Sequence, residues 1–235
     1  MYYGYGYGYD PTIILVLIGA LISGIASIRV RTTFNKYDKI RNVHGYTANE
    51  VAERILHSAG IYDVKIERIR GNLSDHYSPN EKVLRLSDAT YGKTSVAAIG
   101  VAAHECGHAI QHQEGYAPLK MRAMSVPLAN IGSWVSWPVI LLGLILGYTP
   151  LAQVGIFLFT FVVAFQLITL PVEFDASARA LRILDQDHFL EEDEHRGATK
   201  VLKAAAMTYV AALFTTILQL LRLVLIVSNM GRRND

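Results

Sequence analysis

The chain has 235 residues, of which 51% are hydrophobic and only 18% are charged. Soluble domains carry about 25% charged residues, so this composition argues against a soluble enzyme and indicates a membrane protein in contact with a lipid bilayer. The formal net charge of +2, without a patch of mixed basic and aromatic residues, argues against a nucleic-acid partner.

The first apolar segment runs from Pro11 to Ile28 and contains no charged residue. No Lys or Arg precedes it and it lacks a small-residue cleavage site, so we interpret it as a retained transmembrane helix rather than a secretory signal. We therefore expect residues 1–28 to form an N-terminal tail and a first transmembrane helix. The tail alternates glycine with tyrosine, and we assign it no function.

Polar sequence is concentrated in residues 29–122, where we expect a small α+β domain. Residues 47–60 have an apolar face at helical spacing and a capping box at their start, which together predict a helix. Alternation of apolar and charged residues predicts a strand at 64–67. A second strand is predicted at 83–86, with turn-forming residues at 78–80 ahead of it.

A second apolar region, Ala123 to Val172, is 50 residues long and has no charge. A single span needs roughly 20 residues, and turn-forming residues at 147–150 divide the region, so 123–172 is expected to form a transmembrane hairpin. Residues 173–203 should form a further helix and a loop, and 204–235 a fourth transmembrane helix and tail. The predicted fold is a mainly α membrane protein, with a four-helix transmembrane bundle and the small α+β domain.

Basic residues near the predicted spans indicate the orientation, because Lys and Arg favour the cytoplasmic side. Several lie directly after the first span, at 29–41, and several more follow the hairpin, at 179–203. We therefore expect a multi-pass protein of the cell membrane with residues 29–122 on the cytoplasmic side. A fourth span would place Arg232 and Arg233 on the outer side, which is contrary to this rule.

A longer helix, predicted from about Ser95 to Gln113, contains the sequence HECGH, a match to the pattern H-E-x-x-H. Residues four apart share one helix face, so His104 and His108 can bind the same Zn²⁺ ion. Glu105 lies beside them and can accept a proton from a water whose pKa the metal lowers to about 7. The alternative is a buried helix whose histidines only form hydrogen bonds, but such polar groups are costly to bury without a metal.

Two further side chains near the motif are poor candidates for the third zinc ligand. His112 continues the spacing of four, but the helix rise places it about 12 Å from His104 along the axis, too far for one ion. Cys106 lies two positions from His104 and points to another face, so we expect it to pack in the core.

Glu173 and Asp175 directly follow the chargeless region, and a carboxylate in such a place needs a partner. Two spans separate His108 from Glu173, so the chain returns to the same side of the membrane, where Glu173 can complete the metal site. We expect the sequence around Glu173 to begin a helix whose first turn holds this residue. The competing explanation is that both acids only stabilise the start of that helix through its dipole.

Four segments, between these spans, resemble one known family: NLSDHYSPNEKVLRLS, GVAAHECGHAIQH, PLANIGSWVSW and TLPVEFDASARA. They are similar to the bacterial YugP-type neutral zinc metallopeptidases, and the similarity covers nearly the whole chain from about residue 30. The resemblance implies an integral-membrane metallopeptidase with His104 and His108 as ligands and Glu105 as catalytic base. A more distant likeness to membrane gluzincins of the HtpX kind implies Glu173 as third ligand. Those relatives have an aspartate where this chain has Ser177.

A second polar cluster, Asp75, His76 and Tyr77, precedes the second predicted strand. In gluzincins a strand beside the metal pairs with extended substrate, and a nearby donor can stabilise the oxyanion of the tetrahedral intermediate. His76 or Tyr77 could supply that hydrogen bond, and we take His76 as the catalytic candidate. Asp75 is equally well explained by a turn that opens the hairpin.

Together these patterns predict a multi-pass zinc endopeptidase with a zincin-like domain, acting on peptides or membrane proteins. The alternatives are a catalytically silent scaffold that binds zinc for structure, and a membrane protein that passes metal ions on. Glu105 argues against both, because neither role needs a base beside the ligands. The sequence indicates neither a cleavage specificity nor an oligomeric state.

Overall fold

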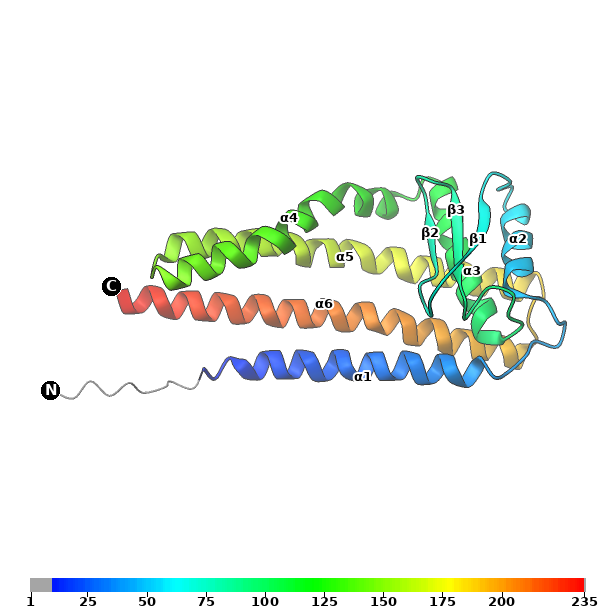
Figure 1. Ribbon diagram of the computed structural model, residues 1–235, viewed down its shortest axis with the longest axis horizontal. Helices are drawn as coiled ribbons and strands as arrows, with labels where there is room; N and C mark the ends of the chain where they lie inside the picture. The colour runs from blue at the N-terminus through cyan, green and yellow to red at the C-terminus, as the bar shows by residue number, and fades with distance from the viewer. Residues whose placement is uncertain (1–9, 235) are drawn as a thin grey trace. The chain divides into compact units, whose positions relative to one another are not determined.

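The structure is a computed structural model that describes residues 10–234, so the Gly-Tyr tail at 1–9 lies outside the described residues. The described chain is mainly helical with one small sheet, as the sequence predicts. Figure 1 labels its elements in chain order: α1 (Ile13–Tyr37), α2 (Ala48–Ser58), β1 (Lys65–Ile69), β2 (His76–Ser78), β3 (Val83–Ser87), α3 (Val96–Gln113), α4 (Ala117–Ile145), α5 (Thr149–Gln186) and α6 (Glu192–Asn234).

Four helices of the described chain, α1, α4, α5 and α6, are long and apolar enough to cross a membrane. This agrees with the four membrane helices expected from the sequence. Arg222, which interrupts the apolar part of α6, forms a 3.0 Å ion pair with Asp10. Because ionisable residues in apolar spans are tolerated when they are paired, this contact explains how α6 accommodates a cation.

The described chain forms two compact units, the first of which consists of residues 10–24, 127–164 and 211–234. Within this unit, small residues let helices approach closely. A Cβ on Gly143 would lie 2.5 Å from the backbone nitrogen of Ala152, so α4 and α5 touch at their backbones. Between α6 and α1, the Thr215 hydroxyl donates to the Gly19 carbonyl at 3.0 Å. Such contacts are typical of helices that pack in lipid.

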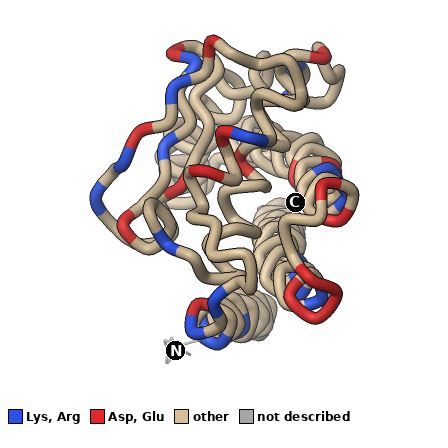
Figure 2. The backbone as a smooth tube through the Cα atoms, turned by 90° about the vertical axis from the view of Figure 1, so that its right-hand side faces the viewer, with Lys and Arg blue, Asp and Glu red and all other residues tan. Residues whose placement is uncertain are grey.

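The second unit, residues 25–126 and 165–210, contains the α+β part and most of the charged residues (Figure 2). Its sheet has the order β1-β3-β2, with β1 parallel and β2 antiparallel to β3. The predicted capping box opens α2: Glu50 N–H donates to Thr47 Oγ1, and Thr47 N–H donates to Glu50 Oε2. The helices α2 and α3 and the sheet share one core, which includes Ile55, Leu84 and Ile99.

The strand β2 is an addition to the predicted sheet, and it ends at Ser78, where the expected turn begins. Asp75 anchors its start, because the N–H and the hydroxyl of Ser87 both donate to the Asp75 carboxylate, at 2.7 and 2.9 Å. A strand of three residues is too short to display an alternating pattern, so its pairing with β3 leaves no clear signal in the sequence.

The helix α5 differs from its prediction, because it runs without a break from Thr149 to Gln186. The expectation of a helix that begins at Glu173 is therefore wrong, and Glu173 lies deep inside α5. Pro171 resembles a helix boundary, since proline removes a backbone hydrogen bond, but membrane helices tolerate it where neighbouring groups satisfy the freed carbonyl. The competing explanation of Glu173 as an acid at a helix start fails for the same reason.

Candidate metal centre

The helix α3 carries the H-E-x-x-H motif. Its start is fixed by Ser95, whose hydroxyl accepts a hydrogen bond from Ala98 N–H at 3.2 Å. His104 and His108 lie one turn apart, with their rings edge to face and their ring centroids 4.8 Å apart. The two imidazoles therefore occupy one face of α3, as the spacing of four predicts.

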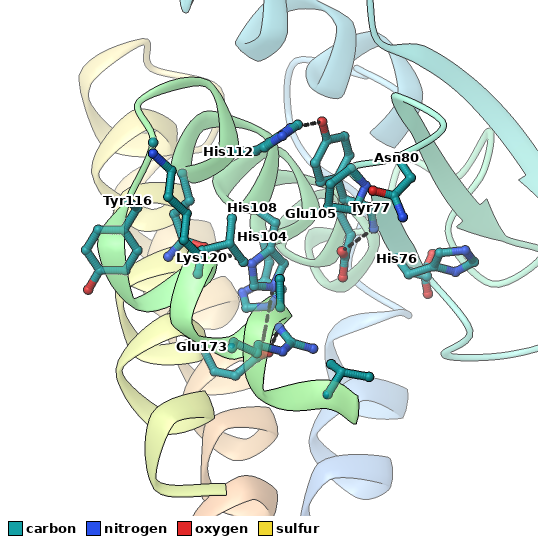
Figure 3. A pocket seen from close by; sticks show the side chains of 18 of the residues that line it. His76, Tyr77, Asn80, His104, Glu105, His108, His112, Tyr116, Lys120 and Glu173 are labelled. Atoms are coloured by element: carbon teal, nitrogen blue, oxygen red, sulfur yellow. Dashed lines mark hydrogen bonds and ion pairs between the residues drawn. The ribbon is translucent and has the colours of Figure 1, made fainter. Parts of the chain in front are cut away.

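Glu173 of α5 joins these histidines. Its Oε2 lies 3.3 Å from Nε2 of His104 and 3.6 Å from Nε2 of His108. One ligand atom from each of the three residues lies within 4.8 Å of the other two. Figure 3 shows the three side chains converging, and only 3% of Glu173 is exposed. The structure thus brings together the three residues that the sequence singled out as metal ligands.

A glycine between the histidines allows this approach. A Cβ added at Gly107 would lie 2.5 Å from the carbonyl oxygen of Ala176 in α5, closer than packed atoms allow. Any larger residue would push α3 away from α5. Gly107 therefore helps to set the distance between the two histidines and Glu173.

The cluster has the spacing and the electrostatics of a zinc site. Tetrahedral ligands bound at about 2.0–2.1 Å lie roughly 3.3 Å from one another, close to the separations found here. Glu173 Oε2 is buried and has no hydrogen-bond partner in the described chain, which is costly unless a cation binds it. Burial lowers the pKa of His108, but the Glu173 and Glu105 carboxylates raise it above its usual value, so the local field favours a positive charge.

Gln111, one turn beyond His108 on α3, determines which nitrogen of His108 carries the proton. Its amide NH₂ donates to the Val172 carbonyl at 2.9 Å and to Asp175 Oδ2 at 2.8 Å, so its own oxygen remains to accept. His108 Nδ1 lies 3.0 Å from that oxygen and must donate to it. The lone pair of His108 Nε2 is thereby directed to the cluster, where a metal can use it.

His104 is supported from α5, because the hydroxyl of Ser177 lies 3.1 Å from its Nδ1. Asp175 contacts Gln111 and forms an ion pair with Arg179. The sequence left the roles of Asp175 and Ser177 open. In the structure each lies behind one histidine, Ser177 directly and Asp175 through Gln111.

Arg122 of α4 is a site residue that the sequence analysis missed. Its Nη1 lies 3.1 Å from Oε1 of Glu173, so one carboxylate oxygen is paired while Oε2 faces the histidines. The sequence did contain a signal: Arg122 and Glu173 are the charged residues that flank the chargeless region 123–172. A hairpin with arms of similar length brings its two ends together, so these residues could have been paired in advance.

The strand β2 touches the motif through Glu105. Tyr77 N–H donates to Glu105 Oε2 at 3.0 Å, and the Tyr77 hydroxyl lies 2.9 Å from Nδ1 of His112. His112 is thus engaged away from the ligand cluster, in line with the limit set by the helix rise. His76 is exposed, and its Nδ1 lies 2.9 Å from the Ser74 carbonyl, so the structure does not bring it into contact with the cluster.

These residues line a cavity of about 440 Å³, within the range of about 300–1,000 Å³ that is usual for ligand sites. Glu105 and the ligand cluster form one part of its wall, and His76 lies on the wall as well. Tyr209 of α6 also lines the cavity, although no sequence pattern pointed to it. The cluster is therefore open to a ligand that enters this cavity.

Four apolar helices and a buried cluster of two histidines and one glutamate characterise a membrane metalloprotein with a zinc-type site. The chain belongs to a family of zinc metallopeptidases: the family model described as "Putative neutral zinc metallopeptidase" matches residues 12–228. The protein described as "Putative membrane protease YugP", from Bacillus subtilis (strain 168), is 46% identical over 217 residues, or 92% of this chain and 96% of that protein. These matches confirm the resemblance seen in the motifs, and the cofactor of the family is Zn²⁺. No solved structure matches the chain.

Proposed function

We propose that the chain is an integral-membrane zinc endopeptidase that cleaves peptides or membrane proteins. The observation that carries this proposal is the meeting of His104, His108 and Glu173 at one buried point, with Glu105 beside them on the cavity wall. Membership of the family supports a peptidase, and the description of the relative as a membrane protease supports a membrane location. In this proposal the α+β part is a zincin-like domain.

His104, His108 and Glu173 are the proposed holders of the zinc ion, which when bound supplies a Lewis acid and lowers the pKa of water. Glu105 is the proposed general base. One of its oxygens is held by Tyr77 N–H at 3.0 Å, so its other oxygen can take a proton from the attacking water. The same carboxyl group then passes the proton to the nitrogen of the leaving amine.

The oxyanion that develops on the scissile carbonyl needs a hydrogen-bond donor within the cavity. His76 remains our candidate from the sequence, but its ring must turn away from the Ser74 carbonyl to act. Tyr77 has its hydroxyl next to His112 and its N–H on Glu105, so it positions other groups. Tyr209, on the same cavity wall, is a second candidate donor.

We also propose that the catalytic residues work on the cytoplasmic side of the cell membrane. The support for this is the concentration of basic residues at 29–41 and at 179–203. These residues lie next to apolar helices, in the same segments that carry the site. In this arrangement residues 29–122 supply the motif, and residues 173–203 supply the third ligand and its neighbours.

The variant Glu105→Gln tests the enzymatic proposal. The amide cannot accept a proton from water, whereas the ligands are unchanged, so zinc should stay near one per chain while proteolysis is lost. The measurement is digestion of an unstructured protein substrate by the detergent-purified chain, together with metal analysis. Glu53→Gln, an exposed glutamate on α2, is the matched control and should leave both quantities unchanged.

Full proteolysis in Glu105→Gln would remove the enzyme proposal. Zinc content near one per chain with no proteolysis in the unaltered chain, over a broad set of substrates, would favour the silent scaffold. Rapid exchange of the bound metal by the unaltered chain would favour a role in metal handling.

A further inference from the structure

A second cavity, of about 680 Å³, lies in the unit that contains the metal cluster, between α1, α5 and α6. Each helix contributes one face to it. From α1 come Arg29, Thr33 and Lys36, which are spaced by four and three residues, and from α6 come Lys200 and Lys203, which are one turn apart. Residues at these spacings project from the same side of a helix, so the faces of α1 and α6 both present cations to this cavity.

The charges around this cavity are all of one sign. Its lining contains Arg29, Lys36, Lys200 and Lys203 but no aspartate or glutamate. Among residues 10–231, none of these four cations forms an ion pair with a carboxylate. Arg68, Arg85 and Arg179 of the same unit do have acidic partners, whereas exposed lysines such as Lys65 and Lys93 have none within the described residues. What sets the four cations apart is therefore their convergence on one cavity whose lining contains no acid. Four cations without a carboxylate partner around one concave surface favour an anionic ligand.

The cations lie where each helix changes from polar to apolar sequence. Arg29 directly follows the chargeless segment that ends at Ile28, and Lys203 directly precedes the apolar part of α6 that begins at Ala204. The apolar side of the cavity includes Phe174 and Met207, whose exposed fractions are 46% and 47%. The ligand that matches this lining has an anionic head and an apolar tail.

From these observations we propose that the cavity between α1, α5 and α6 binds a membrane phospholipid with an anionic headgroup. The headgroup phosphate lies among Arg29, Lys36, Lys200 and Lys203, and an acyl chain runs along Phe174 and Met207. Basic pockets between membrane helices are a known type of site for such headgroups. This site is separate from the catalytic proposal, although Ser177 lines the cavity and also contacts Nδ1 of His104.

The same cations could serve only to orient the helices in the membrane, since Lys and Arg are enriched on cytoplasmic flanks. That role requires basic residues near the ends of the spans, but it does not require them to converge on one cavity or to lack acidic partners. A site for a small anion is the other alternative. Free phosphate would need the cations but would make no use of the apolar wall.

The proposal is tested by measuring lipid binding to the full chain in detergent, with native mass spectrometry as the readout. The probes are phosphatidylglycerol, phosphatidylcholine with the same acyl chains, and inorganic phosphate. We expect phosphatidylglycerol to bind on the order of tenfold more tightly than phosphatidylcholine, and phosphate not to displace it. Removing two cations with Lys200→Gln and Lys203→Gln should weaken the binding of phosphatidylglycerol on the order of tenfold or more.

Two matched pairs of substitutions make the result specific. Lys200→Arg with Lys203→Arg keeps the charges and should retain binding, and Lys65→Gln with Lys93→Gln removes two exposed lysines elsewhere and should also retain it. Three results would each overturn the proposal. The two lipids could bind equally well, or the two Gln pairs could weaken the binding of phosphatidylglycerol equally. The third result is an equal loss of that binding in the Gln pair and the Arg pair at 200 and 203. Displacement of phosphatidylglycerol by millimolar phosphate would assign the cavity to a small anion instead.

Discussion

Gln111 and Arg122 support the metal cluster at the scale of single residues, although no motif marks either of them. Gln111 fixes the proton on Nδ1 of His108, and Arg122 pairs with Oε1 of Glu173. The ligands themselves could be predicted, because His104 and His108 follow a local helical spacing. The roles of Gln111 and Arg122 depend on contacts between helices, and a single sequence shows such contacts only indirectly.

The first prediction at this scale concerns Glu173. Glu173→Ala should lower zinc affinity sharply and abolish activity, and Glu173→Gln should be nearly as damaging, because a neutral amide is a poor zinc ligand. Asp175 is linked to the ligand His108 through Gln111, so Asp175→Ala should lower zinc affinity by about 10- to 100-fold. The measurement is the zinc retained by the three variants under the same chelator challenge.

His112→Ala is the matched control for Glu173, because it removes a histidine of α3 that hydrogen-bonds to Tyr77 outside the ligand cluster. Its zinc content should stay close to that of the unaltered chain. Zinc retained in Glu173→Ala, or zinc lost from His112→Ala as completely as from His108→Ala, would mean that the ligand set is different.

A second prediction concerns Cys106, the single cysteine of the chain. Burial, with the charge of Glu105 as a smaller cause, raises the pKa of the Cys106 thiol well above its usual value. The reactive thiolate is therefore scarce at neutral pH. A maleimide reagent should leave the folded chain unmodified at pH 7.5 over hours and modify it fully in denaturant, as measured by mass spectrometry. Rapid modification of the folded chain would contradict the burial of this residue.

At the scale of elements, prediction succeeds where the signal is local. The capping box of α2 and the extent of α3 follow from side chains within one or two turns, and the structure contains both. The strand β2 and the continuity of α5 through Pro171 were not predicted. Both depend on distant partners: β3 and Asp75 hold β2 in place, and neighbouring helices stabilise a helix that contains proline.

The packing of α3 on α5 gives a prediction at this scale. In Gly107→Ala the new methyl group would meet the Ala176 carbonyl at 2.5 Å, so α3 must move away from α5. We expect a loss of about 1–3 kcal/mol in the free energy of unfolding, together with faster release of zinc, because the histidines separate from Glu173. The measurements are thermal unfolding in detergent and the rate of zinc release to a chelator.

Gly100→Ala provides the comparison for Gly107 on the same helix. Its added Cβ would lie 3.3 Å from the methyl group of Ala198 in α6, a contact that a small shift can relieve. We expect a smaller loss of stability and an unchanged rate of zinc release. Equal effects of the two substitutions would show that the α3–α5 contact has no special part in the geometry of the site.

At the scale of the whole molecule, the proposed orientation depends on charges alone. Basic residues at 29–41 and 179–203 favour the cytoplasmic side, while the turn between α4 and α5 is free of charge. The metal cluster gives a second reason to place both segments on one side. His108 and Glu173 lie together in the structure, and the chain between them contains two of the apolar helices, α4 and most of α5.

Cysteine labelling can test this orientation without removing the native cysteine, because Cys106 is buried. Lys39→Cys and Asp187→Cys place thiols at exposed positions on the two basic segments, and Tyr148→Cys places one in the turn between α4 and α5. On intact cells, a maleimide that cannot cross membranes should label only the variant at 148, whereas the other two should react after permeabilisation.

Labelling of positions 39 and 187 from opposite sides would contradict a hairpin of two spans. The chain between His108 and Glu173 would then have to cross the membrane in a different way. Labelling of all three from outside would mean that α4 and α5 do not cross the bilayer. If only 39 and 187 react on intact cells, the hairpin stands and the orientation is reversed, which would place the proposed active site outside the cell.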